Sequence, residues 1–106
     1  MVQLTDRACE ELERLLRDNF AGARQAVRLR LDPAGRLRMT IDVPHPGDSL
    51  IRHGIAPVLI VDARLGRTLA PRVLDFAGSV DGRPSAGFVL GWRTPDHRLG
   101  MPAELG

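Results

Sequence analysis

Side chains able to bind a soft metal or act as a nucleophile are few in this 106-residue chain, which holds one cysteine and three histidines. Thiolate and imidazole are the usual protein ligands of iron, zinc and copper. Cys9 has no second cysteine near it, and His45, His53 and His97 show no spacing that would place two of them on one helix face. We therefore predict no metal and no cofactor, with Cys9 a small buried hydrophobic residue and the histidines in solvated loops.

Residues arranged for catalysis are not visible in the sequence either. The serines lack the Gly-x-Ser-x-Gly context of an activated nucleophile, and no glycine-rich phosphate-binding loop is present. Four aspartates stand at predicted turns, caps and strand ends, where this residue type has structural uses: Asp48, Asp62, Asp75 and Asp81. The sequence therefore predicts a protein that is not an enzyme and has no catalytic residue.

Arginines are concentrated in residues 28–39, RLRLDPAGRLRM, although the net charge of the chain is only +2. Apolar residues alternate with arginines on both sides of the turn that begins at Asp32, which predicts two antiparallel strands with one buried face. The turn fits type I, followed by a left-handed Gly35. This register puts Arg30 opposite Arg38 on the outer face. The inner pairs are Leu31 with Leu37, Leu29 with Met39, and Val27 with Ile41.

A set of basic side chains on the outer face of this hairpin predicts a patch for an acidic protein partner. Trp92, at the end of the last predicted strand, is a candidate for the same kind of contact. The predicted partner-binding residues are Arg28, Arg30, Arg36, Arg38 and Trp92. Nucleic acid is disfavoured as the partner because the chain has few aromatic residues to stack on bases. A homo-oligomer is compatible with the sequence.

The remaining pattern predicts one α+β domain over residues 1–92 and a mobile tail over residues 93–106. A helix over residues 5–20 is capped by Thr5 and carries an apolar stripe that ends at Phe20. Asp62 caps a short helix over residues 63–69. Further strands are expected, in a mainly antiparallel or mixed sheet, at residues 49–52, 55–61, 73–77 and 87–92, with a turn at 81–82.

The order of these motifs resembles that of the HesB/IscA-like family, the A-type proteins of iron–sulfur cluster assembly. The resemblance covers about residues 2–92. It is carried by short segments whose order and spacing match: Leu4-Thr5-Asp6-Arg7-Ala8, Gly47-Asp48, Gly54-Ile55, Val61-Asp62-Ala63-Arg64-Leu65, Leu74-Asp75-Phe76 and Gly87-Phe88. It implies a small α+β fold and a link to iron–sulfur biogenesis.

The residues that the family uses for chemistry are missing here. Family members typically carry one cysteine in a Ser-Gly-Cys-Ser-Gly-like turn after the first strand and two in a Cys-Gly-Cys-Gly tail, because thiolates ligate iron–sulfur clusters. This chain has Asp32-Pro33-Ala34-Gly35 in place of the first motif and Leu99-Gly100-Met101-Pro102 in place of the second. We therefore predict a non-catalytic accessory or protein-interaction module, linked to iron–sulfur or sulfur metabolism.

Two other functions are left open by the sequence. A residual iron or cluster carrier would bind metal between subunits or with an external thiol, using Cys9 or His97. An anion-binding or RNA-binding protein would use the arginine hairpin. The first residues show no basic segment followed by an apolar one, and no apolar stretch approaches the ~20 residues of a membrane helix, so we expect a cytoplasmic protein without a membrane anchor.

Overall fold

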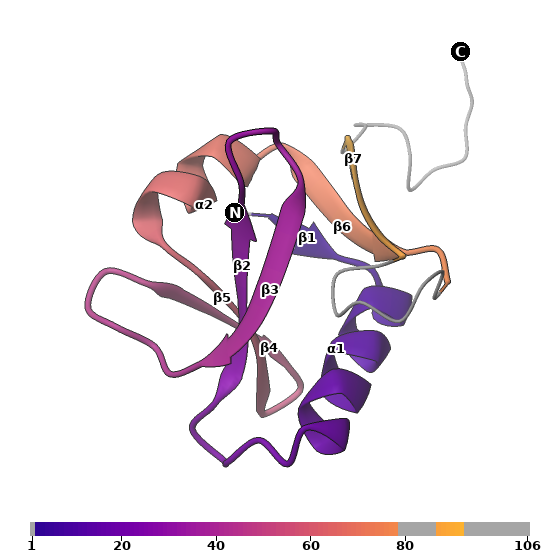
Figure 1. Cartoon of the computed structure of the whole chain (residues 1–106), viewed down its shortest axis with the longest axis vertical. Helices are drawn as coiled ribbons and strands as arrows, with labels where there is room; N and C mark the ends of the chain where they lie inside the picture. The colour runs from indigo at the N-terminus through magenta and orange to yellow at the C-terminus, as the bar shows by residue number, and fades with distance from the viewer. Residues whose placement is uncertain (1, 79–86, 93–106) are drawn as a thin grey trace.

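The computed structural model describes residues 2–78 and 87–92. Within these ranges the chain forms two helices and seven strands (Figure 1), in the order β1 Gln3–Leu4, α1 Asp6–Asp18, β2 Ala26–Leu31, β3 Leu37–Asp42, β4 Ser49–His53, β5 Ala56–Val61, α2 Ala63–Leu69, β6 Arg72–Phe76 and β7 Phe88–Trp92. The predicted turn at 81–82 and the predicted mobile tail at 93–106 lie outside the described residues. No described helix is long and apolar enough to cross a membrane.

The strands form two sheets, whereas the sequence predicted one. The larger sheet has the order β3-β2-β5-β4 and the smaller has the order β1-β6-β7. Each sheet contains one parallel pair, β2 with β5 and β1 with β6, and the other pairs are antiparallel. The strand β1 was missed because two residues are too short to show a period. The predicted α+β class, with a mixed arrangement of strands, is confirmed.

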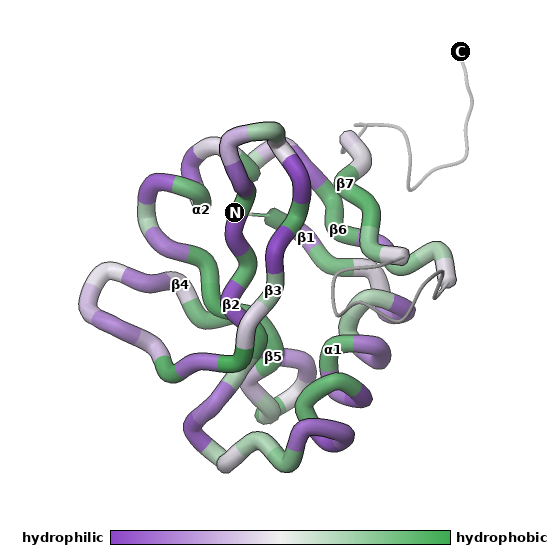
Figure 2. Tube along the Cα trace, viewed as in Figure 1, coloured by the Kyte–Doolittle hydropathy of each residue, from purple (hydrophilic) through white to green (hydrophobic). Residues whose placement is uncertain are grey.

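Helix α1 joins the two sheets because it packs against β6 of one and against β2 and β5 of the other. Ala8 and Leu12 of this helix are fully buried and belong to one core with Leu29, Leu59 and Leu74 from the strands. Figure 2 shows the same division, with hydrophobic segments on the strands inside and hydrophilic positions along the outer side of α1. The amphipathic stripe of the helix therefore supplies the apolar surface that both sheets cover.

The start of α1 was predicted correctly. Thr5 is the N-cap, and its hydroxyl oxygen accepts a hydrogen bond from the backbone N–H of Ala8 at 3.2 Å. The same hydroxyl donates to a carboxylate oxygen of Asp75 in β6 at 2.6 Å. The first turn of α1 is thereby attached to the strand on which it packs.

The end of α1 was predicted wrongly, because the helix stops before Phe20 and the ring does not join the core. Asn19 is the C-cap, and Phe20 has a left-handed backbone with φ of 53°. The N–H of Ala21 donates to the carbonyl of Leu16, and the N–H of Phe20 donates to the carbonyl of Arg17. These are the two hydrogen bonds of a Schellman motif, whose left-handed position is usually glycine. The Phe20 side chain is 94% exposed.

The hairpin of β2 and β3 has the predicted register. Leu31 pairs with Leu37 and Leu29 with Met39, while Arg30 pairs with Arg38. Gly35 adopts the left-handed conformation, with φ of 82°, that the turn requires. The alternation of apolar and basic residues was sufficient to predict this register, because a slip of one residue would expose the whole apolar set.

Ile55 and Gly87 were predicted to be the first residues of two strands, and in the structure both lie just before those strands. Ile55 was expected to begin a buried strand, but it lies in the turn between β4 and β5 and is 93% exposed. Gly87 precedes β7 with φ of 88°, and a Cβ atom there would lie 1.9 Å from the carbonyl oxygen of Gly78. Only glycine allows this close approach of the two chain segments.

We predict that Phe20→Gly stabilises the protein. A left-handed backbone costs an L residue about 1–2 kcal/mol, and the exposed ring forms no core contact that would be lost. After the greater flexibility of glycine in the unfolded chain is subtracted, the unfolding free energy should rise by about 0.5–1 kcal/mol, measured by urea denaturation. Phe20→Ala keeps the strained conformation and should change stability little. A glycine variant less stable than the alanine variant would contradict this prediction.

Candidate functional site

Arg28, predicted to be part of the exposed arginine patch, is buried instead, with 4% of its surface exposed. Its position in β2 does place it on the outer side of the hairpin, but the loop between β3 and β4 folds over it. The sequence showed the alternation and could not show that this loop covers one end of the outer face. The patch predicted from the sequence therefore loses one of its four arginines.

Two aspartates neutralise the buried guanidinium. The Nε atom of Arg28 donates to Asp42 at 2.7 Å, and its Nη2 atom donates to Asp48 at 2.6 Å. Nη2 also donates to the carbonyl of Val43 at 3.2 Å. Asp48 in turn accepts a hydrogen bond from the backbone N–H of His45 at 2.7 Å. This cluster, which we call the Arg28 cluster (Arg28, Asp42, Val43, His45 and Asp48), holds the 43–48 loop against β2.

The Arg28 cluster changes the acidity of its members in the directions expected for close opposite charges. The hydrogen bond from Arg28 is the main cause that lowers the pKa of Asp48, and the same holds for the pKa of Asp42. The pKa of Arg28 is raised, chiefly by its hydrogen bonds to Asp48. All three groups are therefore charged at neutral pH, and the guanidinium occupies the place between the carboxylates that a cation would need. The cluster has a structural role and does not fit a metal.

The other predicted partner-binding residues lie on the surface. Arg30, Arg36 and Arg38 are exposed, and Arg38 forms a salt bridge with Asp32 at 3.1 Å. Trp92 is 66% exposed, and the guanidinium carbon of Arg72 lies 4.2 Å from the centre of its ring. Trp92 belongs to the smaller sheet and the hairpin to the larger one. Their proposed role in binding a partner stays a prediction.

The turn where the resemblance implies a cysteine ligand is closed by hydrogen bonds of its own. One carboxylate oxygen of Asp32 accepts from the N–H groups of Ala34 and Arg36, both at 2.9 Å, and the other accepts from Arg38 at 3.2 Å. The N–H of Gly35 donates to the carbonyl of Asp32 at 2.8 Å. Both oxygens of the only acidic side chain in this turn are in use, and the turn contains no sulfur atom. The residues present do not fit an iron–sulfur cluster.

Among the described residues, the possible substitutes for the missing ligands are not brought together by the structure. Cys9 is buried in α1, and burial is the main cause that raises the pKa of its thiol. Ligation needs the thiolate, so this environment is unfavourable for it. His53 lies 3.3 Å from Glu13, and His97 lies outside the described residues. Within residues 2–78 and 87–92, no three His, Cys, Asp or Glu side chains form a group that could hold a metal ion.

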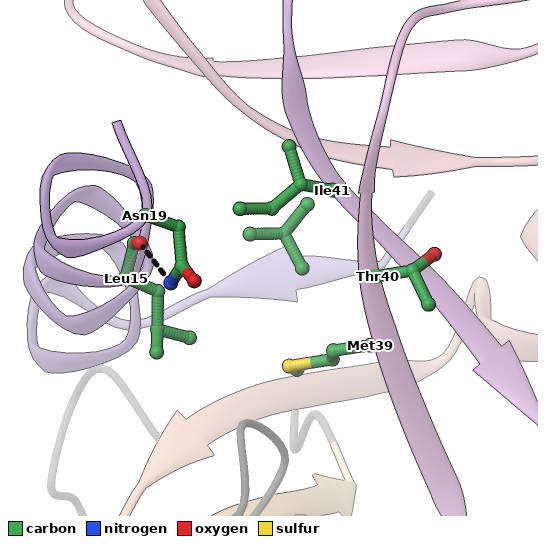
Figure 3. Close-up of a pocket in the computed structure, with 6 residues that line it drawn as sticks. Leu15, Asn19, Met39, Thr40 and Ile41 are labelled. Carbon is green, nitrogen blue, oxygen red and sulfur yellow. Dashed lines mark hydrogen bonds between the residues drawn. The ribbon is translucent and has the colours of Figure 1, made fainter. Parts of the chain in front are cut away.

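A cleft of about 300 Å³ lies between α1 and β3 (Figure 3), with an apolar lining that includes Leu15, Val27, Met39 and Ile41. The polar side chains at its wall are Thr40 and Asn19, and the amide nitrogen of Asn19 donates to the carbonyl of Leu15 at 2.8 Å. No titratable side chain from residues 2–78 or 87–92 lines this cleft. These residues can receive an apolar group, but they offer no acid, base or nucleophile for a reaction.

These features define a small α+β protein whose fold is HesB/IscA-like. A protein from Aquifex aeolicus, solved by NMR in solution, superposes with a TM-score of 0.65 at 21% identity over 89% of this chain and 91% of its own. The crystal structure of IscA with the [2Fe-2S] cluster superposes with a TM-score of 0.54 at 22% identity over 91% of this chain and 86% of its own. No protein-family model and no curated protein matches the sequence.

We predict that Asp48→Asn destabilises the protein by about 2–3 kcal/mol, because a buried guanidinium loses one of its two charged partners. The measurement is the free energy of unfolding in urea at pH 7. Asp18→Asn is the matched control, since Asp18 pairs with Arg14 on the exposed side of α1 and such pairs contribute little. Equal effects of the two substitutions would show that burial of the Arg28 cluster is unimportant.

The lowered pKa values of Asp42 and Asp48 predict a pH dependence of stability. A carboxylate whose pKa is lower in the folded state stabilises the protein fully above its unfolded pKa, which is about 4 for aspartate. This stabilisation is lost as the pH falls below that value and through the lower folded pKa. The unfolding free energy should therefore decrease between pH 5 and pH 2, less steeply in Asp48→Asn. Parallel curves for the wild type and the variant would contradict this prediction.

Proposed function

We propose that this protein is a non-catalytic interaction module, which uses an IscA-like scaffold to bind a protein partner and does not carry a cluster. The observation that supports this most directly is the turn at Asp32–Gly35. In the family that the sequence resembles, this turn carries a cysteine ligand, and here it is a self-contained β-turn. A fold by itself does not determine an activity, so the loss of the ligands argues against transfer of the family's chemistry.

The link to iron–sulfur or sulfur metabolism is part of the same proposal. It rests on the fold shared with IscA and on the family motifs in the sequence. Several of those motif residues keep defined structural roles here, such as Thr5 hydrogen-bonded to Asp75 and Asp48 paired with Arg28. A fold that has these structural contacts but lacks the family's cysteine ligands is consistent with an accessory protein that acts beside a related metal-binding protein.

The outer side chains support a protein partner more than a nucleic acid. Arg30 and Arg36 are exposed on the hairpin, but Arg38 is already paired with Asp32, which reduces the charge available for phosphates. Arg30 also borders a hollow between the hairpin and α2, together with Asp62 and Arg64. A surface that mixes both signs of charge is better suited to a protein than to the uniform negative charge of a nucleic-acid backbone.

The test is anaerobic reconstitution with ferrous iron and sulfide, followed by iron and sulfide analysis and a visible absorption spectrum. We expect no stoichiometric iron and no thiolate-to-iron absorption in the folded protein, because Cys9 is buried as a thiol. An IscA protein treated in parallel is the positive control.

The competing interpretation, a residual carrier, predicts a different outcome of the same experiment. Stoichiometric iron that disappears in Cys9→Ser or His97→Ala would overturn the proposed function and identify the ligands. Circular dichroism of each variant checks that the fold is intact, so that loss of iron is not confused with loss of structure.

A further inference from the structure

Two large apolar side chains stand almost fully in solvent at one end of the molecule. Phe20 follows the last turn of α1, and Ile55 lies in the turn between β4 and β5; their exposed fractions are 94% and 93%. Val43, directly after β3, is 41% exposed. Scattered exposed apolar residues are common, but three from separate connecting segments that border two adjoining hollows indicate an interaction site.

The backbone of Phe20 adds a second, independent indication. A bulky residue in the left-handed region is an outlier, and glycine or asparagine would end the helix at lower cost. The ring is also in water, so no packing in the described chain compensates for the strained backbone. Strained residues concentrate at functional sites. Phe20 therefore presents an exposed aromatic side chain beside the end of α1, where a partner can contact it.

Two adjoining hollows lie beside these side chains. One, of about 400 Å³, is bordered by Leu16, Arg17, Phe20 and Pro57 among others, and the second, of about 580 Å³, by Val43, Leu50, Ile55 and Pro57 among others. Ala23 and Pro57 border both hollows, which therefore adjoin each other. We call this surface the Phe20–Ile55 face, defined by Phe20, Ala23, Val43, Ile55 and Pro57.

The charged side chains around the Phe20–Ile55 face are mostly basic. Arg17 borders the first hollow, and Arg24 and Arg52 border the second. Within the described part of the chain, none of these three arginines forms a salt bridge. The acidic residue at the rim is Glu13, which lies 3.3 Å from His53. Hollows with a mixed apolar and polar lining and a basic rim are complementary to a segment that combines apolar side chains with carboxylates.

We propose that the Phe20–Ile55 face binds an acidic amphipathic helix of a protein partner. A helix satisfies its own backbone hydrogen bonds, so it can place apolar side chains in both hollows while its carboxylates reach the arginines. Phe20 and Ile55 are then the main apolar contacts, and Arg17, Arg24 and Arg52 select the charge of the partner. This inference rests on the proposed function as an interaction module and names the chemistry of what it binds.

The test uses a fluorescent, helix-forming peptide of about 18 residues with leucines at i, i+3, i+4 and i+7 and glutamates at the other exposed positions. Its binding to the full chain is measured by fluorescence anisotropy. We expect binding that weakens as the salt concentration increases and falls about tenfold or more in Phe20→Gly and in Ile55→Ser. Because Phe20→Gly is expected to be more stable than the wild type, unfolding cannot explain a loss of binding.

The matched control is Val89→Ser, which removes an exposed apolar side chain from β7, away from the Phe20–Ile55 face (Figure 1). It should bind the peptide as the wild type does. The second control is a peptide with lysine in place of every glutamate, which should bind at least tenfold more weakly because the rim is basic. The double variant Arg24→Ala and Arg52→Ala should weaken the binding of the acidic peptide and leave the binding of the basic peptide unchanged.

Three outcomes would overturn the inference. These are no binding of the acidic peptide, equal binding of both peptides, or self-association of the protein, by sedimentation equilibrium, that Phe20→Gly abolishes. The last would identify a second copy of the chain as the occupant. If the protein carries no cluster and does not bind the peptide, this inference is wrong and the proposed function stands. If the protein carries a cluster, the proposed function is wrong, whether or not the peptide binds.

Discussion

The structure depends on a buried ion pair, formed by the guanidinium of Arg28 in the inner strand β2 and the carboxylate of Asp48. A cation in a protein interior must be paired, because an isolated buried charge costs several kcal/mol. Asp42 and Asp48 supply the pairing from the end of β3 and from the loop that follows it. To reach Arg28, the loop must fold back over the outer face of the hairpin. The ion pairs therefore hold the chain between β3 and β4 against the outer face of the hairpin, while β4 takes its place in the sheet by pairing with β5.

Several residues that carry the resemblance to the HesB/IscA-like family have structural roles in this fold. Thr5 caps α1 and also bonds to Asp75, which joins a helix at the beginning of the chain to a strand 70 residues later. Gly87 permits a close approach to Gly78 that no other residue allows. These contacts are needed to build the fold, whatever the fold is used for. The fold can therefore form without cysteine ligands, because none of these contacts involves the turn or the tail segment where the resemblance implies such ligands.

The side chains of this protein that are available for binding lie on its surface. In the described part of the chain, the apolar cleft beside α1 has no titratable lining residue, the single cysteine is buried, and the buried charges of Arg28 and Asp48 neutralise one another. In contrast, Phe20 combines a strained backbone with an exposed ring, and Ile55 is exposed in a turn. The strained backbone of Phe20 lowers the stability of the isolated chain, and the exposed side chains contribute almost no burial to offset it. Deviations from local structural preference that bring no compensation within the chain are expected at functional sites.

The sequence by itself determined the elements whose signals are local. Alternation of leucine and arginine specified the β2–β3 register, Thr5 and Asp62 marked the starts of both helices, and the turn at residues 32–35 contains no cysteine. Tertiary structure alone decided that Arg28 is buried, that the strands divide into two sheets, and that Phe20 and Ile55 are exposed. The physical reason is that periodicity reports which face of an element a residue occupies, but not what covers that face. The 43–48 loop covers Arg28 and leaves Arg30 in solvent, although both lie on the same side of β2.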